Sequence, residues 1–316
     1  MEQNFETCLY NVVDAAKIQK DEPMKKHTTF RIGGPADYFI MPSNEKELAE
    51  AVRVCRKFLI PIYIVGNGSN LLVGDKGFRG AIIQLYKSMG TFQVEGNQIT
   101  AQAGCSLAQI ANAALDAALT GFEFAAGIPG TLGGAVVMNA GAYGGEMKDV
   151  LTSVRVMTEE GEIMELPAEE LGLGYRTSII PEKRYIVLGA VISLTEGKKE
   201  EIKAQMDDLR QKRVSKQPLE YPSAGSTFKR PEGYFAGKLI MDAGLCGYQT
   251  GGAQVSEKHC GFVINKGNAT ATDVCRLIKD VQDKVKEQFG VTLEPEVKFL
   301  GDFEDTDLQI STSFRK

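Results

Sequence analysis

Histidine and tryptophan are almost missing from this chain of 316 residues, which has two histidines and no tryptophan. Neither His27 nor His259 stands in a zinc-binding pattern, and a zinc site needs three or four converging nitrogen or sulfur ligands. A serine triad that depends on histidine is equally poorly supplied. We therefore expect no metal site, and a chemistry that depends on something other than imidazole.

Long apolar runs are missing too. The longest, Phe58 to Val65, falls far short of the roughly 20 residues that cross a bilayer. The N-terminal stretch MEQNFETCLYNVVDAAKIQK has no basic region followed by an apolar one, so no leader for secretion is expected. The sequence therefore predicts a cytoplasmic protein with no membrane partner.

Positive charge is not in excess, because Lys+Arg number 36 against 41 Asp+Glu, a formal net charge of -5. Grooves that bind nucleic acid concentrate Lys and Arg against phosphates, so no nucleic-acid partner is expected. With 43% hydrophobic residues the chain has the composition of a folded globular protein, and its length predicts two or three domains.

The six cysteines form no Cys-x-x-Cys pair. Their wide spacing in a long chain without a leader predicts reduced thiols rather than a disulfide framework. Nothing in the pattern indicates which of them takes part in redox chemistry. They are Cys8, Cys55, Cys105, Cys246, Cys260 and Cys275.

Capping residues and apolar periodicity indicate several helices. One is expected over Asn44 to Leu59, where Glu47 completes a variant of the capping box, and it leads into a short buried strand, Pro61 to Val65. A second begins with the capping box of Ser106 and Gln109, continues to about Leu119 and stops at Gly121.

Two further helices are expected in the second half. A polar one, Glu200 to Lys212, is followed by Gln217-Pro218 and Tyr221-Pro222, a candidate domain boundary. The other, Thr272 to Phe289, has one apolar stripe and ends at Gly290. Because helices and strands do not alternate strictly, the pattern predicts an α+β fold. Further strand-like runs are Ala81 to Leu85, Gly96 to Ala103, Ser153 to Met157, Tyr185 to Leu194 and Gly261 to Asn265.

Glycine gathers in two loops, Gly66 to Asn70 and Gly127 to Gly134. The first fails the dinucleotide fingerprint because Leu71 replaces the third glycine, and Gly233 to Lys238 fails the spacing of a phosphate-binding loop. Glycine still lets consecutive N–H groups converge on an anion. The two loops could hold the two ends of a large phosphate-containing cofactor, although tight turns alone would explain each of them.

Several motifs now occur in a recognisable order. Taken together, from Thr28 to the C-terminal region, they resemble the UDP-N-acetylenolpyruvoylglucosamine reductase family, flavoenzymes of peptidoglycan precursor synthesis. The motifs are TTFRIGGPAD (Thr28 to Asp37), VGNGSNLLV (Val65 to Val73), GIPGTLGGAVVMNAGAYGGE (Gly127 to Glu146), GYRTS (Gly174 to Ser178), AGSTFKRP (Ala224 to Pro231), GGAQVSEKHCGFVIN (Gly251 to Asn265) and LEPEV (Leu293 to Val297).

The resemblance implies an α+β architecture with a two-part FAD-binding cradle of the vanillyl-alcohol-oxidase-like type and a C-terminal α+β domain for the UDP-sugar. Residues 1–86 would form the first FAD-binding part, with 298–316 as a candidate return of the chain to it, 87–212 would form the second part, and 213–297 the substrate domain. FAD is expected to be bound non-covalently, with NADPH as reductant. The implied cofactor-binding residues are Gly66, Asn67, Gly68, Ser69, Asn70, Leu71, Gly127, Pro129, Gly130, Thr131, Gly134, Ala140 and Gly141.

The implied reaction converts UDP-N-acetylglucosamine enolpyruvate to UDP-N-acetylmuramate. Hydride passes from N5 of reduced FAD to C3 of the enol ether, and a proton is added at C2. By their places in the motifs, Arg176 and Glu296 would stabilise the enolate and Ser226 would donate the proton. Taken singly, these three are ordinary surface or turn residues, and only their joint occurrence in family order points to catalysis.

Substrate contacts are expected from a basic cluster around Ser226, suited to the diphosphate, and from residues beside the matched motifs. These are Arg213, Lys216, Lys229 and Arg230, with Tyr143, Tyr175 and His259. A solvated basic face and packed aromatic rings are the alternatives.

Two departures from the family pattern stand out. The interval from Arg176 to Ser226 lacks the insertion whose tyrosine covers the substrate in longer members, so the chain resembles a shorter subclass. His27 stands where asparagine is more usual, and related flavin oxidases attach FAD to a histidine. Two other functions stay open: a flavin oxidase that acts on another substrate, and a UDP-sugar-binding protein without catalysis.

Overall fold

A computed structural model describes residues 4–303 of the chain, which fold into two compact units. The chain passes from one unit to the other five times. Three of the crossings lie within the strands β1 (Ile18–Pro23), β2 (Pro35–Ile40) and β5 (Phe78–Gln84), one lies between Asn67 and Gly68, and one lies near the end of helix α5 (Lys199–Lys216). Of the described residues, the first unit contains 4–19, Phe39–Asn67 and Ala81–Arg213, and the second contains Lys20–Tyr38, Gly68–Gly80 and 214–303.

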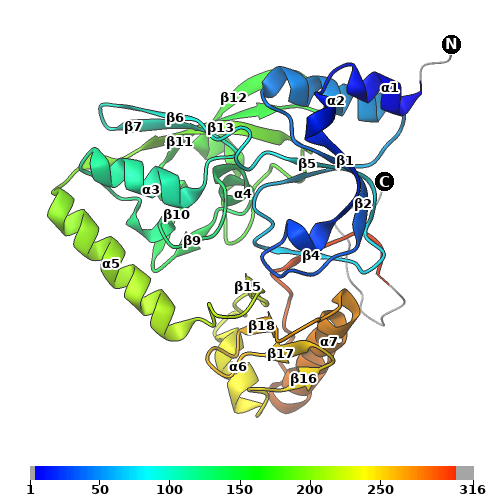
Figure 1. The fold of residues 1–316 in the computed structure, drawn as a ribbon. Coiled ribbons are helices and arrows are strands. Elements are labelled where there is room, and N and C mark those ends of the chain that lie inside the picture. The colour runs from blue at the N-terminus through cyan, green and yellow to red at the C-terminus, as the bar shows by residue number, and fades with distance from the viewer. Residues whose placement is uncertain (1–3, 304–316) are drawn as a thin grey trace. The chain divides into compact units, whose positions relative to one another are not determined.

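The first unit is built on a five-stranded antiparallel sheet in the order β12-β11-β13-β7-β6. Helices α3 and α4 pack against this sheet (Figure 1). Fully buried aliphatic side chains, among them Ile99, Val154 and Ile192, form its core. The strands are β6 (Phe92–Glu95), β7 (Gln98–Gln102), β11 (Leu151–Met157), β12 (Ile163–Pro167) and β13 (Ile186–Ser193).

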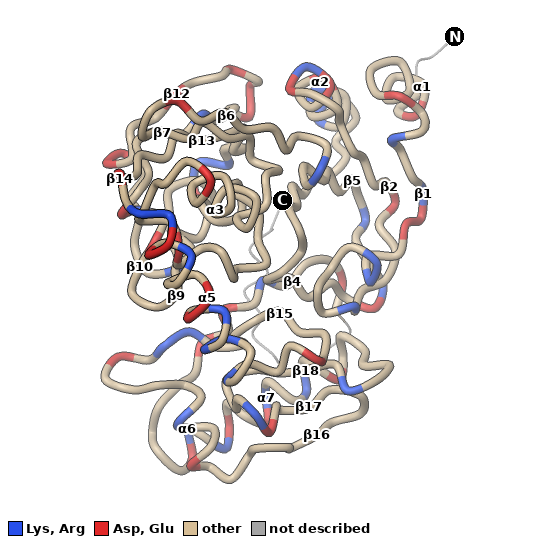
Figure 2. The backbone as a smooth tube through the Cα atoms, turned by 60° about the vertical axis from the view of Figure 1, so that its left-hand side comes forward, with Lys and Arg blue, Asp and Glu red and all other residues tan. Residues whose placement is uncertain are grey.

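Smaller elements complete this unit. Strand β3 (Ile62–Val65) pairs in parallel with β5. Strand β8 (Leu119–Thr120) pairs antiparallel with β14 (Thr195–Glu196), and β9 (Gly141–Ala142) pairs antiparallel with β10 (Gly145–Glu146). Helix α5 contains residues of both charges, and its charged residues after Asp208 are all Lys or Arg (Figure 2). The helices are α1 (Phe5–Tyr10), α2 (Glu45–Lys57), α3 (Leu107–Asp116), α4 (Leu132–Val137) and α5 (Lys199–Lys216), with 3-10 turns η1 (Ala15–Lys17), η3 (Glu123–Ala125), η4 (Met147–Asp149) and η5 (Ala168–Leu171).

The second unit contains an antiparallel sheet in the order β15-β18-β17-β16, against which α7 packs with α6 beside it (Figure 1). Its core joins residues from distant parts of the chain, including Phe30, Leu72 and Leu277. Strand β4 pairs in parallel with β19 near the C-terminus. The elements are η2 (Met24–Lys26), β4 (Leu71–Val73), β15 (Ser223–Ser226), α6 (Ala236–Asp242), β16 (Gln249–Thr250), β17 (Ala253–Val255), β18 (Phe262–Asn265), α7 (Ala271–Phe289) and β19 (Lys298–Leu300).

The predicted helix starts are confirmed by their caps. Asn44 Oδ1 accepts from Glu47 N at the start of α2, and Ser106 and Gln109 form a complete capping box at α3. Helix α7 ends as expected at Gly290. The α+β class is confirmed as well, because both units mix helices with largely antiparallel sheets.

Three expectations about elements are wrong. Helix α3 ends at Asp116 rather than Leu119, because Leu119 pairs with Glu196 in a strand and Ala118 takes a positive φ of 55°. The strand after α2 is buried only at Val65. Helix α5 is longer than predicted, and of Ile202, Met206 and Leu209, which the spacing predicts to face inward, only Ile202 is buried.

The expectation of six reduced thiols is also wrong. Cys246 and Cys260 form a disulfide across 14 residues of sequence, with their Cα atoms 5.5 Å apart. The fold brings them together, because Cys246 follows α6 and Cys260 precedes β18. Cys55, Cys105 and Cys275 are buried and unpaired. Among the helices of residues 4–303, none is long and apolar enough to cross a membrane.

Candidate functional site

The two glycine loops meet in the first unit, where Gly66 and Asn67 follow β3. Asn67 Nδ2 donates to the carbonyl of Pro129 over 2.7 Å. A Cβ added at Gly66 would lie 2.2 Å from Thr131 Oγ1, so only glycine fits against the second loop there. Loops that are distant in the sequence therefore present their backbones together, as the cofactor prediction requires.

Thr131 anchors the second loop. Its side chain is 2% exposed and caps α4, accepting from Gly134 N over 3.5 Å. The carbonyl of Gly130 accepts from Leu107 N over 3.1 Å, which ties the loop to the start of α3. Further along, the N–H of Ala140 donates to Ala135 O over 2.8 Å. This loop is thus held by its own backbone and by a buried hydroxyl.

The rest of the first loop belongs to the second unit. Gly68 has a φ of +61°, and a Cβ there would lie 2.2 Å from the carbonyl oxygen of His27. Asn70 Nδ2 donates to Glu296 O over 3.1 Å, and Asn70 O accepts from Lys298 N over 3.0 Å. The end of the loop is therefore joined directly to the segment that contains Glu296.

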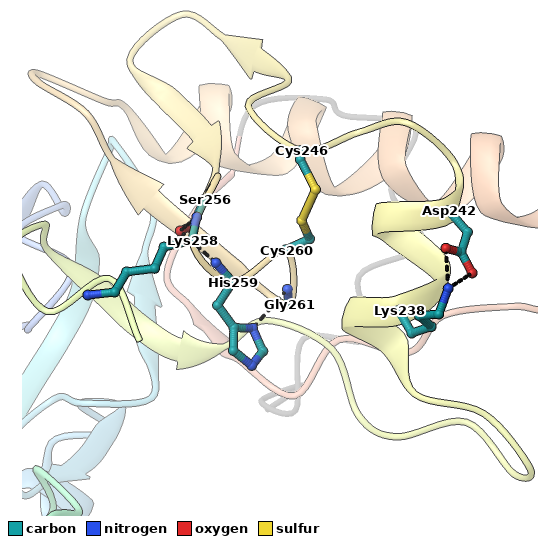
Figure 3. The surroundings of a disulfide bond; sticks show 8 residues. All are labelled: Lys238, Asp242, Cys246, Ser256, Lys258, His259, Cys260 and Gly261. Carbon is teal, nitrogen blue, oxygen red and sulfur yellow. Dashed lines mark hydrogen bonds and ion pairs between the residues drawn. A yellow bond between two sulfur atoms is a disulfide. The ribbon is translucent and has the colours of Figure 1, made fainter. Parts of the chain in front are cut away.

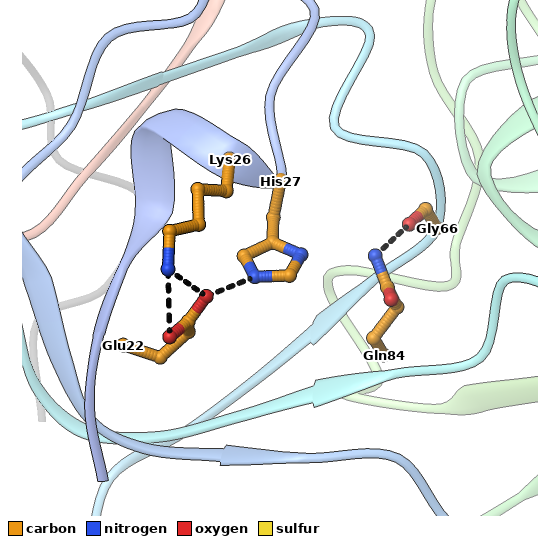
Figure 4. A network of polar contacts seen from close by, with 5 residues as sticks. All are labelled: Glu22, Lys26, His27, Gly66 and Gln84. Atoms are coloured by element: carbon orange, nitrogen blue, oxygen red, sulfur yellow. Dashed lines mark hydrogen bonds and ion pairs between the residues drawn. The ribbon is translucent and has the colours of Figure 1, made fainter. Parts of the chain in front are cut away.

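His27 lies beside this loop in an ionic group (Figure 4). Its Nε2 lies 2.9 Å from Glu22 Oε1, and Lys26 Nζ lies 3.2 Å from the same oxygen. Burial tends to raise the pKa of the Glu22 carboxyl, but the hydrogen bonds from His27 and Lys26 lower it overall. In the same figure, Gln84 donates to the carbonyl of Gly66 over 3.3 Å.

Arg176 stands in a tight turn of the first unit. Gly174 and Thr177 exchange backbone hydrogen bonds of 3.2 and 3.3 Å around it, and Arg176 itself has a φ of +56°. The guanidinium donates to the carbonyl of Gly141 over 3.2 Å. A positive φ is uncommon outside glycine and often marks a functional position.

Asn139 holds this turn through its side-chain hydrogen bonds. It is fully buried, donates to Gly174 O over 3.0 Å and to Glu146 Oε2 over 2.9 Å, and accepts from Lys148 N over 2.9 Å. The pKa of Glu146 is lowered by its hydrogen bonds from Lys148 and Asn139 and by the charge of Arg176. The turn therefore holds a fixed cation beside an ionised carboxylate.

The predicted substrate contacts of the first unit lie around Arg176 and Arg213. Tyr175 and Tyr143 are each 50% exposed, and the Arg176 guanidinium lies 5.3 Å from the centre of the Tyr175 ring. A Cβ added at Gly127 would lie 3.2 Å from Arg213 Nη1, so the Arg213 side chain lies against this glycine. Burial lowers the pKa of Arg213, and the Tyr143 hydroxyl partly offsets that effect. These four polar side chains border the second glycine loop or the Arg176 turn.

Ser226 and Glu296 are brought close together in the second unit. Ser226 ends β15 opposite Phe262, and the next residue, Thr227, accepts at its carbonyl from Glu296 N over 2.8 Å. Ser226 is exposed, and Glu296 is half-buried. The two predicted catalytic groups therefore occupy neighbouring backbone segments.

Cationic groups flank this pair. Lys229 Nζ lies 3.2 Å from Glu294 Oε2, and Arg230 lies 4.0 Å from the centre of the exposed Phe235 ring. Burial and the charge of Lys229 lower the pKa of Lys298, whereas Glu296 raises it. Of the predicted basic cluster, Lys216, Lys229 and Arg230 thus belong to the second unit and Arg213 to the first.

His259 lies near the disulfide (Figure 3). Its Nδ1 accepts from Gly261 N over 3.2 Å, and its ring packs edge-on against Phe262 with centroids 4.9 Å apart. Burial lowers the pKa of His259, and the charge of Lys216 lowers it further. A backbone hydrogen bond acts in the opposite direction, but the net effect favours the neutral form of the ring.

The predicted residues are divided between the units. Arg176 lies in the first, whereas Ser226 and Glu296 lie in the second, so the convergence of all three on one substrate stays a prediction. Within residues 4–303 no group of acidic, histidine or cysteine side chains is arranged to hold a metal ion.

Sequence reasoning missed Asn139, Glu146 and Lys298. Asn139 and Glu146 stand inside the motif that begins at Gly127. The signal available in the sequence was a polar asparagine between an apolar stretch and a glycine-rich turn, and the structure shows that this asparagine is buried. No motif includes Lys298, which directly follows LEPEV. The structure shows that its charge is close enough to Glu296 to interact with it.

Comparison with known proteins adds a second line of support. A family profile described as the C-terminal domain of UDP-N-acetylenolpyruvoylglucosamine reductase matches residues 217–300, and one described as an FAD binding domain matches 36–167. The reductase of Agathobacter rectalis is 57% identical over 96% of this chain and its own full length, and that of Clostridioides difficile is 52% identical over 95% of this chain and 99% of its own.

A crystal structure of the reductase of Thermus caldophilus superposes with a TM-score of 0.77 at 37% identity. The match covers 88% of this chain and 97% of that protein. Together with the two family profiles, it confirms the predicted fold, in which an FAD-binding region is combined with a C-terminal domain of this reductase type.

Proposed function

The chain belongs to the UDP-N-acetylenolpyruvoylglucosamine reductase family of FAD-dependent oxidoreductases, and from this premise we propose that it reduces UDP-N-acetylglucosamine enolpyruvate to UDP-N-acetylmuramate with NADPH. The main support is a likeness of 57% identity over the whole of a named reductase. The motif residues Arg176, Ser226 and Glu296 are all present, each in a fixed backbone setting. A cytoplasmic site of action fits nucleotide-linked substrates.

The residues of the glycine loops fit a non-covalently bound FAD. The contact of Gly66 with Thr131 and the hydrogen bond from Asn67 to Pro129 leave backbone N–H groups and small side chains where a phosphate-containing group needs close approach. When bound, FAD accepts hydride from NADPH and supplies it to C3 of the substrate. The proposed cradle is Gly66 to Leu71 with Gly127, Pro129, Gly130, Thr131, Gly134, Ala140 and Gly141.

Arg176 and Glu296 are proposed to stabilise the negative charge that develops on the substrate carboxylate when C3 is reduced. A preorganised cation lowers the energy of such a charge without reorganisation. The hydrogen bond from Arg176 to Gly141 O and the turn around it fix that cation. Glu296 would act in its protonated form, donating a hydrogen bond to the enolate.

Ser226 is proposed to donate the proton to C2. A serine hydroxyl is a weak acid, so it donates only to a strongly basic carbon, and its alkoxide needs cationic neighbours. Lys229 and Arg176 are proposed for this role, and Lys298 lies next to Glu296 in the same unit as Ser226. After the reaction, solvent returns the proton to the serine.

The residues proposed to bind the UDP-sugar fall into two sets. Arg213, Lys216, Lys229 and Arg230 would bind the diphosphate, in place of the tyrosine loop of longer members, with Tyr143, Tyr175 and His259 at the sugar and carboxylate. The proposed parts remain 1–86 rejoined by 298–316, 87–212 and 213–297. Pairing of β19 with β4 supports the return of the chain to the first part, while residues 1–3 and 304–316 lie outside the described structure.

Separate half-reactions test the proposal. In the Ser226→Ala variant, NADPH should still bleach the flavin absorbance, but the enolpyruvyl substrate should no longer restore it in the absence of air. The matched change Ser153→Ala, in a strand of the other unit, should leave both rates unchanged. Normal reoxidation of Ser226→Ala would disprove the proton-donor role.

The charge-stabilising pair needs its own variants. Arg176→Ala and Glu296→Gln should each slow substrate-dependent reoxidation about 100-fold or more while flavin stays bound. The alternative is tested with the unmodified protein. If it consumes oxygen with an alcohol or sugar donor, and the enolpyruvyl ether does not reoxidise its flavin, the protein is an oxidase that acts on another substrate.

A further inference from the structure

The disulfide lies close to the proposed proton donor in the second unit. Cys260 immediately precedes Gly261, whose carbonyl accepts from Thr227 N over 2.9 Å. Thr227 follows Ser226 directly, and its Oγ1 accepts from Val263 N over 2.9 Å. The bond at Cys260 therefore holds the strand end against which the Ser226 segment is hydrogen-bonded.

The residues before Cys260 form a compact turn (Figure 3). Ser256 Oγ accepts from the N–H groups of Lys258 and His259, each over 3.2 Å, and Ser256 N donates to Phe262 O over 2.9 Å. Phe262 is also the partner of Ser226 across the two strands. Movement of this turn would thus be passed on to Ser226 through the Phe262 pairing and through the two hydrogen bonds of Thr227.

The two sulfur-bearing residues differ in access. Cys246 is exposed in the loop after α6, whereas Cys260 is 8% exposed. A thiolate from solvent is therefore directed to the sulfur of Cys246, and Cys260 is the leaving group. Cys55, Cys105 and Cys275 are buried thiols whose pKa values burial raises to about 12, 11 and 12, so none of them competes for this exchange.

We propose that Cys246–Cys260 is a reversible redox clamp on the Ser226 strand, opened by a dithiol reductant. A thiolate of the reductant attacks Cys246 Sγ, the S–S bond breaks, and Cys260 leaves as a thiolate that takes up a proton. The second thiol of the reductant then releases Cys246, so the reductant becomes a disulfide while the protein gains two thiols. The inference rests on the proposed function, since it assigns the regulation of that same site.

Opening the clamp removes the covalent link between Cys260 and the loop after α6, and we expect it to loosen the hydrogen bond between Thr227 and Gly261. Proton donation depends on a fixed position of Ser226, so the reduced protein is slower in the step that uses substrate but not in flavin reduction. A disulfide in a cytoplasmic protein is most often transient or redox-sensing rather than structural, which accords with this role.

The holoenzyme tests this directly. Protein prepared without thiols is compared with protein reduced by dithiothreitol and then freed of it, with alkylation and peptide mapping to count thiols at both cysteines. Hydrogen exchange of the Thr227 and Phe262 amides should become about tenfold faster on reduction. Flavin reoxidation by the enolpyruvyl substrate should slow about tenfold, and oxidised dithiothreitol should restore it. Flavin reduction by NADPH should not change.

The double variant Cys246→Ser/Cys260→Ser should behave like the reduced protein whatever the redox treatment. As a matched control, Cys8→Ser, which removes a half-exposed cysteine of the other unit that is not part of the disulfide, should keep the full difference between oxidised and reduced forms. Wild-type protein reduced chemically keeps the test decisive if the double variant folds poorly.

Unchanged amide exchange or an unchanged reoxidation rate after complete reduction would overturn the clamp. Free thiols at both positions in protein never exposed to a reductant would overturn it as well. If exchange accelerates but the enolpyruvyl ether reoxidises the flavin in neither form, the proposed function fails while the mechanical effect of the disulfide stands.

Discussion

At the scale of single residues, Gly68 shows how closely the first glycine loop is packed. Its φ of +61° is a conformation that a Cβ disfavours, and the carbonyl of His27 occupies the place where that Cβ would lie. Gly96 has a similar φ of +57° but no atom within 4 Å of an added Cβ. Alanine substitutions at these two glycines therefore distinguish the cost of backbone strain alone from the cost of strain together with a steric clash.

We predict that Gly96→Ala costs about 1 kcal/mol of unfolding free energy, from strain alone, and leaves FAD affinity unchanged. Gly68→Ala should cost about 3 kcal/mol and weaken FAD binding, because the loop must also shift away from His27. Urea unfolding and flavin titration check both variants. Equal losses in the two would show that the close approach at Gly68 is unimportant.

His259 gives a prediction for pH. Since its pKa in the folded protein is lowered below the usual 6.5, the unfolded chain binds more protons between the two values, and stability rises with pH there. The contribution is complete above about pH 6.5 and is lost as the pH falls through the lowered folded pKa. In an NMR titration the His259 ring should have its midpoint below 6.5, and His259→Gln, which removes that signal, should flatten the pH dependence of unfolding. A midpoint above 6.5 would refute this.

The only candidate-site residues that could be predicted from the sequence are those in or beside a recognisable motif. Asn67 and Thr131 follow from glycine-rich loops, and the structure brings these loops together. The disulfide was not predictable, because Cys246 and Cys260 are joined by the path of the chain after α6 rather than by a local spacing. Lys298 is a different case: it lies two residues from Glu296 but just outside the LEPEV motif, so no motif included it.

At the scale of elements, the starts of helices were the most predictable feature, since caps are local chemistry. For α7 the start was expected at Thr272, close to the observed start, where the capping box of Thr270 and Asp273 precedes Ala271 and Asp75 accepts from the N–H groups of Ala271 and Thr272. Helix ends were harder. The expected continuation of α3 to Leu119 failed because a long-range partner strand, β14, takes that residue.

We predict that Thr270→Ala lowers the free energy of unfolding by about 1 kcal/mol, because the Asp273 N–H in the first turn of α7 loses its partner, the Thr270 hydroxyl. Thr270→Ser keeps the hydroxyl and should restore most of the loss. Denaturant unfolding of both variants measures the difference. An alanine variant as stable as the serine variant would mean that Asp75 alone satisfies this helix terminus.

At the scale of the whole molecule, FAD should act as a folding ligand. A ligand that binds only the native state at 100 times its dissociation constant adds about 2.7 kcal/mol of stability. We predict that stripping the flavin lowers the melting temperature by about 5 °C and that adding FAD back restores it. Riboflavin, which lacks the adenylate and pyrophosphate, is the control and should restore much less. Identical melting with and without FAD would contradict a cofactor site in the glycine loops.

The second unit is assembled from three separate stretches of chain, and this arrangement affects how the protein is made. Strand β4 emerges from the ribosome early, yet its partner β19 is synthesised 225 residues later, from 73 to 298. At 5–20 residues per second, translation takes roughly 10–45 s to cover that distance. For this period Phe30 and Leu72 lack the α7 side chains that later bury them, so the nascent chain exposes apolar surface that chaperones must shield.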